Sequence, residues 1–170
     1  GAHIGYYSLI FAEAVGPSGK VFAFEPNPEN YRLLLKNIRI NKFQNIEPIN
    51  KAVSDKTGVL NLYESDSNSG DHRIYDSEEK RKQIRIQALK IDDLISEMEQ
   101  PLKLIKMDIQ GAEYYALNGM ISLINKSEDL LLSAEFWPYG LKMSGVVPES
   151  FIALLFKLGF TVYEFGGSEM

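Results

Sequence analysis

Short apolar or alternating segments are interspersed with amphipathic segments along most of the chain, which is the pattern of an α/β protein. The short segments predict strands over residues 20–25, 46–53, 59–63, 84–89, 102–109, 129–137 and 160–165. The amphipathic segments predict helices over residues 5–15, 27–41, 92–98, 112–124 and 149–158. Because helices separate most of the strands, we expect a mostly parallel sheet.

Capping residues mark the first two helices. Gly16 and Pro17 end the first, and Asn27 followed by Pro28 begins the second. The side chains expected to face the core are Tyr6, Leu9, Ile10 and Ala14 in the first helix and Leu33, Leu34 and Ile38 in the second.

Residues 64–83 form a long polar segment without regular periodicity. A loop of this length in a compact domain is usually functional or disordered, and we expect residues 67–75 to form part of a substrate lid. Its basic run, Lys80 to Lys82 with Arg85, is expected to be a solvated face. No repeat or linker interrupts the 170 residues, so we expect one domain.

Composition excludes several classes of function. The chain has no cysteine, which removes disulfides, thiolate zinc sites and cysteine nucleophiles and is consistent with the cytoplasm. Its net charge of −5 argues against a protein that grips nucleic acid through phosphates. No apolar run approaches the ~18 residues of a membrane span.

Three carboxylates, Glu25, Asp108 and Glu135, lie at or near the carboxyl ends of predicted strands. Ligands of parallel α/β sheets bind beyond these ends. A core strand rarely tolerates a charge, so we expect the three side chains to face a polar cleft.

The glycine turn at residues 1–5 precedes the first helix, and Glu25 follows Gly5 by twenty residues. In nucleotide-binding α/β folds an acid at this place accepts hydrogen bonds from ribose hydroxyls. The Gly-x-x-x-Gly spacing does not meet the dinucleotide pattern Gly-x-Gly-x-x-Gly, and no phosphate-gripping Gly-Lys-Ser/Thr loop is present. S-adenosylmethionine, an adenosine ligand without a pyrophosphate, fits this spacing.

Several blocks of the chain closely resemble the FkbM family of methyltransferases. The most specific blocks are Glu25-Pro26-Asn27 and KMDIQGAE, residues 106–113, and the resemblance extends from residue 1 to about residue 165. It implies a class I, Rossmann-like methyltransferase sandwich of three layers that methylates a hydroxyl, usually of a sugar or natural product. The acceptor is thus expected to be a small molecule or glycan.

The resemblance also assigns cofactor-binding residues. It places Gly1, Ala2 and Gly5 against the methionine part of S-adenosylmethionine and Glu25 with Pro26 against the ribose. The turn containing Ala52, Val53 and Asp55 is expected beside the adenine, and Asp108 near the reacting centre.

The chain departs from the family pattern at both ends. The family's glycine loop follows an apolar strand and an acidic residue, and this sequence starts at the glycine. We therefore expect a fragment whose sheet lacks its first, central strand. The sequence also stops after one terminal strand, where this fold commonly adds an antiparallel partner.

Asp108 and His72 are the candidates for removing the proton of the acceptor hydroxyl. For Asp108 the structural alternative is a helix cap, and for His72 it is an exposed loop position. Asp71 is expected to orient His72.

The predicted substrate contacts are Gln110, Glu113, Glu135 and Trp137. Glu113 also suits the first turn of a helix, and Glu135 with its aromatic neighbours also suits core packing with a solvated acid. His3 is expected to be a positional residue.

No metal site is expected, because capping explains Asp92 and Asp93. Two other functions stay open: a nicotinamide-dependent oxidoreductase on a Rossmann-like fold, and a non-catalytic, nucleotide-binding relative that binds partners through the same surface.

Overall fold

Strands and helices alternate along the chain, as the apolar pattern predicts. The computed structural model describes residues 1–77, 80–97 and 102–164. Its strands are β1 (Val21–Phe24), β2 (Ile46–Ile49), β3 (Ala52–Val53), β4 (Gly58–Glu64), β5 (Lys82–Leu89), β6 (Leu104–Met107) and β7 (Leu131–Ala134). Its helices are α1 (Tyr6–Val15), α2 (Pro28–Ile40), the 3-10 helix η1 (Ile91–Glu97), α3 (Glu113–Asn118), α4 (Ile121–Asn125), α5 (Pro138–Met143) and α6 (Pro148–Lys157).

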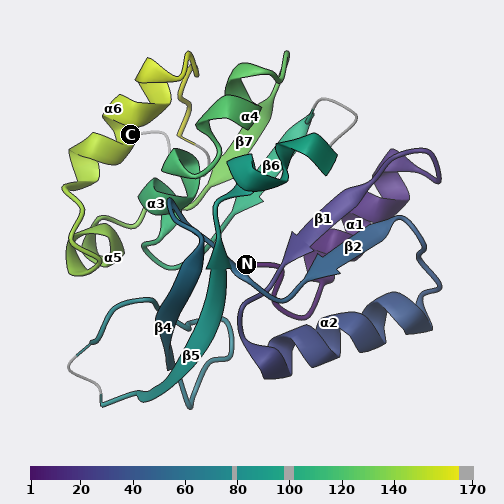
Figure 1. Cartoon of the computed structure of the whole chain (residues 1–170), viewed down its shortest axis with the longest axis horizontal. Helices are drawn as coiled ribbons and strands as arrows, with labels where there is room; N and C mark the ends of the chain where they lie inside the picture. The colour runs from purple at the N-terminus through teal and green to yellow at the C-terminus, as the bar shows by residue number, and fades with distance from the viewer. Residues whose placement is uncertain (78–79, 98–101, 165–170) are drawn as a thin grey trace.

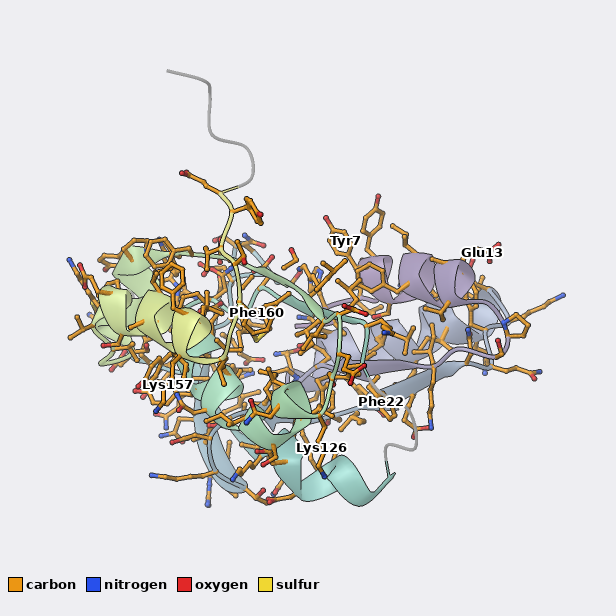
Figure 2. All side chains as sticks on the ribbon, turned by 90° about the horizontal axis from the view of Figure 1, so that it is seen from above. Tyr7, Glu13, Phe22, Lys126, Lys157 and Phe160 are labelled. Atoms are coloured by element: carbon orange, nitrogen blue, oxygen red, sulfur yellow. The ribbon has the colours of Figure 1, made fainter. Side chains whose placement is uncertain are left out.

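Two groups of elements flank the amino terminus (Figure 1). One contains β1 and β2 with α1 and α2, and the other contains β6 and β7 with α3 to α6. Figure 2 views the molecule at right angles and shows the same two groups, with α1 in one and α6 in the other. The paired strands β4 and β5 extend below the amino terminus in the view of Figure 1.

The strands form three hydrogen-bonded sets. β1 pairs with β2, and β6 with β7, both in parallel. β5 pairs in parallel with β3 and antiparallel with β4. The prediction of an α/β fold with mostly parallel strands is confirmed. Over the described ranges no ladder joins β1 to β6.

The largest core cluster belongs to the β6–β7 group, where Leu117, Leu141 and Phe151 are buried. A second cluster, centred on Leu34 of α2 and Ala23 of β1, holds the other group together. Burying a side chain such as Leu34 contributes about 1.5–3 kcal/mol. These two cores fix the strand ends that carry the site.

The predicted inward face of the first helix is only partly correct, because Leu9 packs against the core whereas Tyr6, Ile10 and Ala14 are exposed. The buried positions of α1 are Ser8 and Ala12. Tyr7 is also exposed, and its side chain projects from the outer side of α1 (Figure 2). Because α1 is apolar around nearly all of its circumference, spacing alone does not select a face. The small side chains at the buried positions let the helix approach β1 closely.

Two predicted elements are each divided in the structure. The predicted strand 46–53 becomes β2 and β3, which pair with different strands. The predicted helix 112–124 breaks between α3 and α4 at Gly119, where a Cβ would overlap the carbonyl oxygen of Ser54. Close contact with another segment therefore ends α3.

The predicted last strand is also wrong, since residues 160–164 form no strand; residue 165 lies outside the described residues. Alternating apolar residues adopt a strand only where an edge is available for pairing, and the backbone N–H of Phe160 instead donates to Leu155 at the end of α6. No helix in the described ranges is long and apolar enough to cross a membrane.

Candidate functional site

The three predicted carboxylates follow β1, β6 and β7 at their carboxyl ends. Backbone hydrogen bonds prolong the pairing to Glu25, whose N–H donates to Ile49, and to Glu135, whose N–H donates to Met107. Asp108 directly follows β6. Each predicted acid therefore lies at the carboxyl end of its strand, although β1 is not hydrogen-bonded to β6 or β7 over the described ranges.

The amino-terminal residues lie between two of these strand ends. Ala2 N–H donates to the carbonyl of Phe24 at 2.8 Å. On the other side, a Cβ added at Gly1 would lie 2.8 Å from the carbonyl oxygen of Asp108. The glycine turn therefore joins the β1 side of the site to the β6 side (Figure 1).

Glu25 points into the glycine turn. Its Oε2 accepts the backbone N–H of His3 at 2.7 Å, and its Oε1 accepts the N–H of Asn27 at 3.0 Å. Gly5 closes the turn with a φ of 96°, which favours glycine. The side chain of Asn27 caps α2 by accepting the N–H groups of Glu29 and Asn30, as predicted. Glu25 is thereby fixed between a tight turn and a helix start.

A polar segment covers this carboxylate. We call residues 64–77 the cover segment. Ser69 contacts the glycine turn through His3 Nε2, at 2.9 Å from its Oγ, and its carbonyl accepts Asn30 Nδ2 at 2.8 Å. Glu64 accepts Asn27 Nδ2 at 2.7 Å. Glu25 is consequently only 4% exposed.

His72 lies on this covered side of the site. Its Nδ1 accepts the backbone N–H of Ser65 at 3.1 Å, which leaves the proton of the neutral ring on Nε2. Burial lowers the pKa of His72, although the nearby charges of Glu64 and Glu25 oppose the shift. In the described part of the chain, His72 and Asp108 share no hydrogen bond or ion pair. Its predicted role as a base stays a prediction.

Asp71 does not orient His72, because its carboxylate binds two arginines. Arg73 donates to both of its oxygens at 2.8 Å, and Arg81 pairs with Oδ2 at 2.6 Å. The side chain of Arg81 is buried, so it departs from the solvated basic face expected for residues 80–85. Lys82 is exposed, as expected.

Arg73 is a site residue that the sequence analysis missed. Its guanidinium lies 5.1 Å from the centre of the Trp137 ring and 5.8 Å from that of Tyr75. Arg73, Tyr75 and Ser77 are buried in the structure, but no pattern in the sequence marks Arg73 as inward-facing. Through this residue the cover segment also reaches the β7 side of the site.

A hydrogen-bonded group connects the ends of β6 and β7. Gln110 Nε2 donates to Asp108 Oδ1 at 2.9 Å and to Glu135 Oε2 at 3.1 Å. Lys106 donates to Asp108 Oδ2 at 3.3 Å. Gln110 has a φ of 54° and Gly111 a φ of 94°, so a tight left-handed turn presents the amide to both acids.

The pKa values of Asp108 and Glu135 are shifted in opposite directions. Although partial burial alone would raise it, the Gln110 hydrogen bond and the charge of Lys106 hold the pKa of Asp108 below its usual value. Partial burial and the negative charge of Asp108 raise the pKa of Glu135. Two neighbouring acids with separated pKa values are a common arrangement in acid–base sites.

Glu113 supports this turn from inside. Its Oε1 accepts the backbone N–H of Ile109 at 2.9 Å, and the residue is 0% exposed. Burial raises its pKa, and Oε2 has no hydrogen-bond partner among the residues that the structure describes. The structure thus places Glu113 behind the Asp108–Gln110 turn, out of reach of a substrate, and not at the predicted substrate contact.

Two glycines hold α5 against the same turn. A Cβ at Gly111 would lie 2.5 Å from the backbone of Gly140, and a Cβ at Gly140 would overlap the Trp137 ring. Ser144 Oγ donates to the carbonyl of Gly111 at 2.8 Å. Trp137 is therefore fixed relative to Asp108 by direct backbone contact.

The predicted adenine-side residues lie in and after β3. Ala52 is buried, and Val53 and Asp55 are half-buried. They connect to the end of β1 through Asn50, whose Nδ2 donates to the carbonyl of Glu25 at 2.8 Å and to that of Pro26 at 3.3 Å.

Asp92 caps a helix, although not its own. It accepts the N–H groups of Ser122 and Leu123 at the start of α4, and Asp93 accepts the hydroxyl of Thr57. Within the described residues, no group of three or more histidines and acids is arranged to hold a metal ion.

Comparisons with known proteins identify the family and the fold. Residues 1–151 match the family model of the methyltransferase FkbM domain. A crystal structure of methyltransferase FkbM from Methylobacillus flagellatus KT is similar, with a TM-score of 0.59 and 21% sequence identity. The likeness covers 91% of this chain and 35% of that one, so this chain spans about a third of its length. No curated protein matches the chain.

Proposed function

Because the chain belongs to the FkbM methyltransferase family, we propose that it transfers a methyl group from S-adenosylmethionine to a hydroxyl oxygen of a sugar or natural product. The observation that carries the donor assignment is the hydrogen bond from His3 N–H to Glu25 Oε2. It brings a glycine turn and a strand-end acid together. A ligand with an amino-acid tail and a ribose needs both groups at one place.

The residues on the β1 side fit this donor chemically. Ribose hydroxyls donate hydrogen bonds, and each Glu25 oxygen has a second lone pair after accepting one backbone N–H. Gly1 and Gly5 let the turn pack closely against its neighbours, since a Cβ at Gly1 would lie 2.8 Å from the carbonyl oxygen of Asp108 and one at Gly5 2.7 Å from Leu34. Because Ser69 covers Glu25, binding of the ribose includes displacement of Ser69 from His3 and Asn30.

We assign the adenine to the turn at Ala52, Val53 and Asp55. The support is its connection through Asn50 to the carbonyls of Glu25 and Pro26. If Glu25 binds the ribose, the half-buried Val53 and Asp55 are available to contact the adenine base.

The acceptor is assigned to the β6–β7 side. When bound, S-adenosylmethionine supplies a methyl group on a sulfonium for in-line displacement by the acceptor oxygen. Asp108, Gln110 and Glu135 offer hydrogen-bonding groups for a hydroxyl, and Trp137 offers an aromatic surface for a sugar ring. Aligning the acceptor can supply roughly 7–11 kcal/mol of the barrier.

Calorimetric titration with S-adenosylhomocysteine, S-adenosylmethionine and NADH tests the donor. We expect the two adenosyl compounds to bind and NADH not to bind. Binding of NADH alone would instead support the oxidoreductase. A mass-spectrometric screen for methyl transfer to methyl glycosides and hydroxylated natural products then tests the reaction. S-adenosylhomocysteine binding with no methylated product in the whole panel would support the non-catalytic relative.

A further inference from the structure

A hydroxyl that is methylated must lose its proton. The two acids on the acceptor side, Asp108 and Glu135, differ in the hydrogen bonds that they accept. We infer that Glu135 accepts this proton, with Gln110 as a positioning residue and Asp108 as a fixed negative charge. This inference rests on the proposed function. The hydrogen bonds that join the three residues carry it.

Three other candidate bases are already engaged or inaccessible. His72 uses its Nδ1 lone pair to accept the backbone N–H of Ser65. Glu25 lies at the end of β1, is only 4% exposed, and has its remaining lone pairs assigned to the ribose. Glu113 is fully buried. None of the three offers an acceptor atom to a hydroxyl at the ends of β6 and β7.

Asp108 and Glu135 differ in their free acceptor atoms. Gln110 binds Oδ1 of Asp108, and Lys106 binds its Oδ2. Gln110 binds only Oε2 of Glu135, and no donor in the described part of the chain binds Oε1. Glu135 is exposed, so its Oε1 can receive a proton and pass it to solvent.

The charges around Glu135 favour its protonated form. Partial burial has the largest effect, followed by the negative charges of Asp108 and Glu113; Lys106 opposes them, and Asp71 adds to them. Proton transfer to a base of raised pKa is more favourable, and general base catalysis typically contributes about 10²–10⁴-fold.

The step balances without a further reactant. The acceptor oxygen forms a bond to the methyl carbon, and the carbon–sulfur bond breaks with its electron pair remaining on sulfur. The hydroxyl proton moves to Glu135 Oε1, and solvent removes it before the next turnover. Lys106 and Gln110 keep Asp108 ionised, so its charge stays fixed beside the site.

The experiment compares Glu135→Gln, Asp108→Asn and, as a matched control, Glu149→Gln, an exposed acid in the first turn of α6. Titration with S-adenosylhomocysteine comes first and is expected to give wild-type affinity for Glu135→Gln. If the wild type does not bind it, the proposed function fails. If only Glu135→Gln loses binding, the residue acts on the donor and this inference fails.

Carboxyl ¹³C NMR titration supplies a readout that needs no acceptor. We expect Glu135 to titrate above the ordinary range of glutamate. In Asp108→Asn its pKa should fall, because a neighbouring negative charge is removed. A Glu135 that titrates in the ordinary range, or ignores Asp108→Asn, would overturn the inference even if no acceptor is found.

The kinetic arm uses whichever methyl glycoside the wild type methylates. We expect Glu135→Gln to lower kcat by about 10²–10⁴-fold and to remove the acid limb of its pH profile. Glu149→Gln should retain both. Retention of the acid limb in Glu135→Gln, or its loss in Asp108→Asn alone, would assign the base to Asp108 instead.

Discussion

The backbone N–H of His3 donates to Glu25 Oε2 at 2.7 Å, so the glycine turn and the end of β1 share one hydrogen bond. The two residues are 22 positions apart in the chain. An acid at this place is therefore both part of the fold and part of the proposed donor site. A test of its function therefore needs a variant that keeps the hydrogen bond to the glycine turn and weakens only the binding of the donor.

Glu25→Gln is expected to weaken S-adenosylhomocysteine binding by about 10- to 150-fold, because hydrogen bonds to a charged group contribute about 1.5–3 kcal/mol. The amide still offers one oxygen to a backbone N–H, so the fold should persist. Calorimetry measures the affinity, and circular dichroism checks the fold. Glu29→Gln is the control, since that side chain is 76% exposed. Equal affinities for Glu25→Gln and the wild type would remove the ribose assignment.

Replacing Glu113 should change how stability depends on pH. At low pH its carboxyl is protonated in both the folded and the unfolded chain. Since burial raises the folded pKa, the unfolded chain ionises first as the pH rises, and stability falls from the ordinary glutamate pKa up to the folded one. Glu113→Gln cannot ionise, so it should remove this loss. Urea unfolding between pH 4 and 8 measures it.

Glu113→Ala should behave differently from Glu113→Gln. It leaves the Ile109 N–H without its acceptor, which costs about 1–3 kcal/mol for a buried donor. Glu13→Gln, an exposed acid on α1, should follow the wild-type pH dependence. A wild-type stability that rises steadily over the same range, with no difference for Glu113→Gln, would contradict the buried placement.

Asn27→Ala should lower the free energy of unfolding by about 0.5–2 kcal/mol for the lost cap. The variant also removes the bond to Glu64 that ties the cover segment to α2. Thermal or urea unfolding measures the effect. Asn41→Ala, at the exposed carboxyl end of the same helix, provides the comparison and should cost less. Equal losses would mean that Asn27 acts only through helix propensity.

Arg73→Ala should shift the fluorescence emission of Trp137 to longer wavelength, because the guanidinium beside the ring is replaced by water. Trp137 is the only tryptophan in the chain, so the spectrum reports this site alone. Arg32→Ala removes an exposed arginine on α2 and should leave the spectrum unchanged. An unchanged spectrum in Arg73→Ala would show that the cover segment does not contact Trp137 in solution.

The positions that were predicted correctly from the sequence are set by interactions between residues close together in the chain. Asn27 and Pro28 define a helix start through side chains a few positions apart, and Glu25 and Asp108 follow short apolar strands. These relations need no knowledge of distant contacts.

The features that the sequence missed depend on distant contacts. The break at Gly119 is set by Ser54, and the burial of Arg73 by Asp71 and Trp137. No periodicity in the chain encodes these approaches. The pairing of β2 and β3 with different strands escapes a local pattern for the same reason.

The contact between Gly111 and Gly140 limits how this site can be altered. A methyl group at Gly111 would push α5 and the turn after β6 apart, and one at Gly140 would displace the Trp137 ring. Substitutions at Gly111 or Gly140 are therefore not a way to reshape the acceptor side of the site. Engineering for a different acceptor has to act through the side chains that project from the two backbones, or through the cover segment.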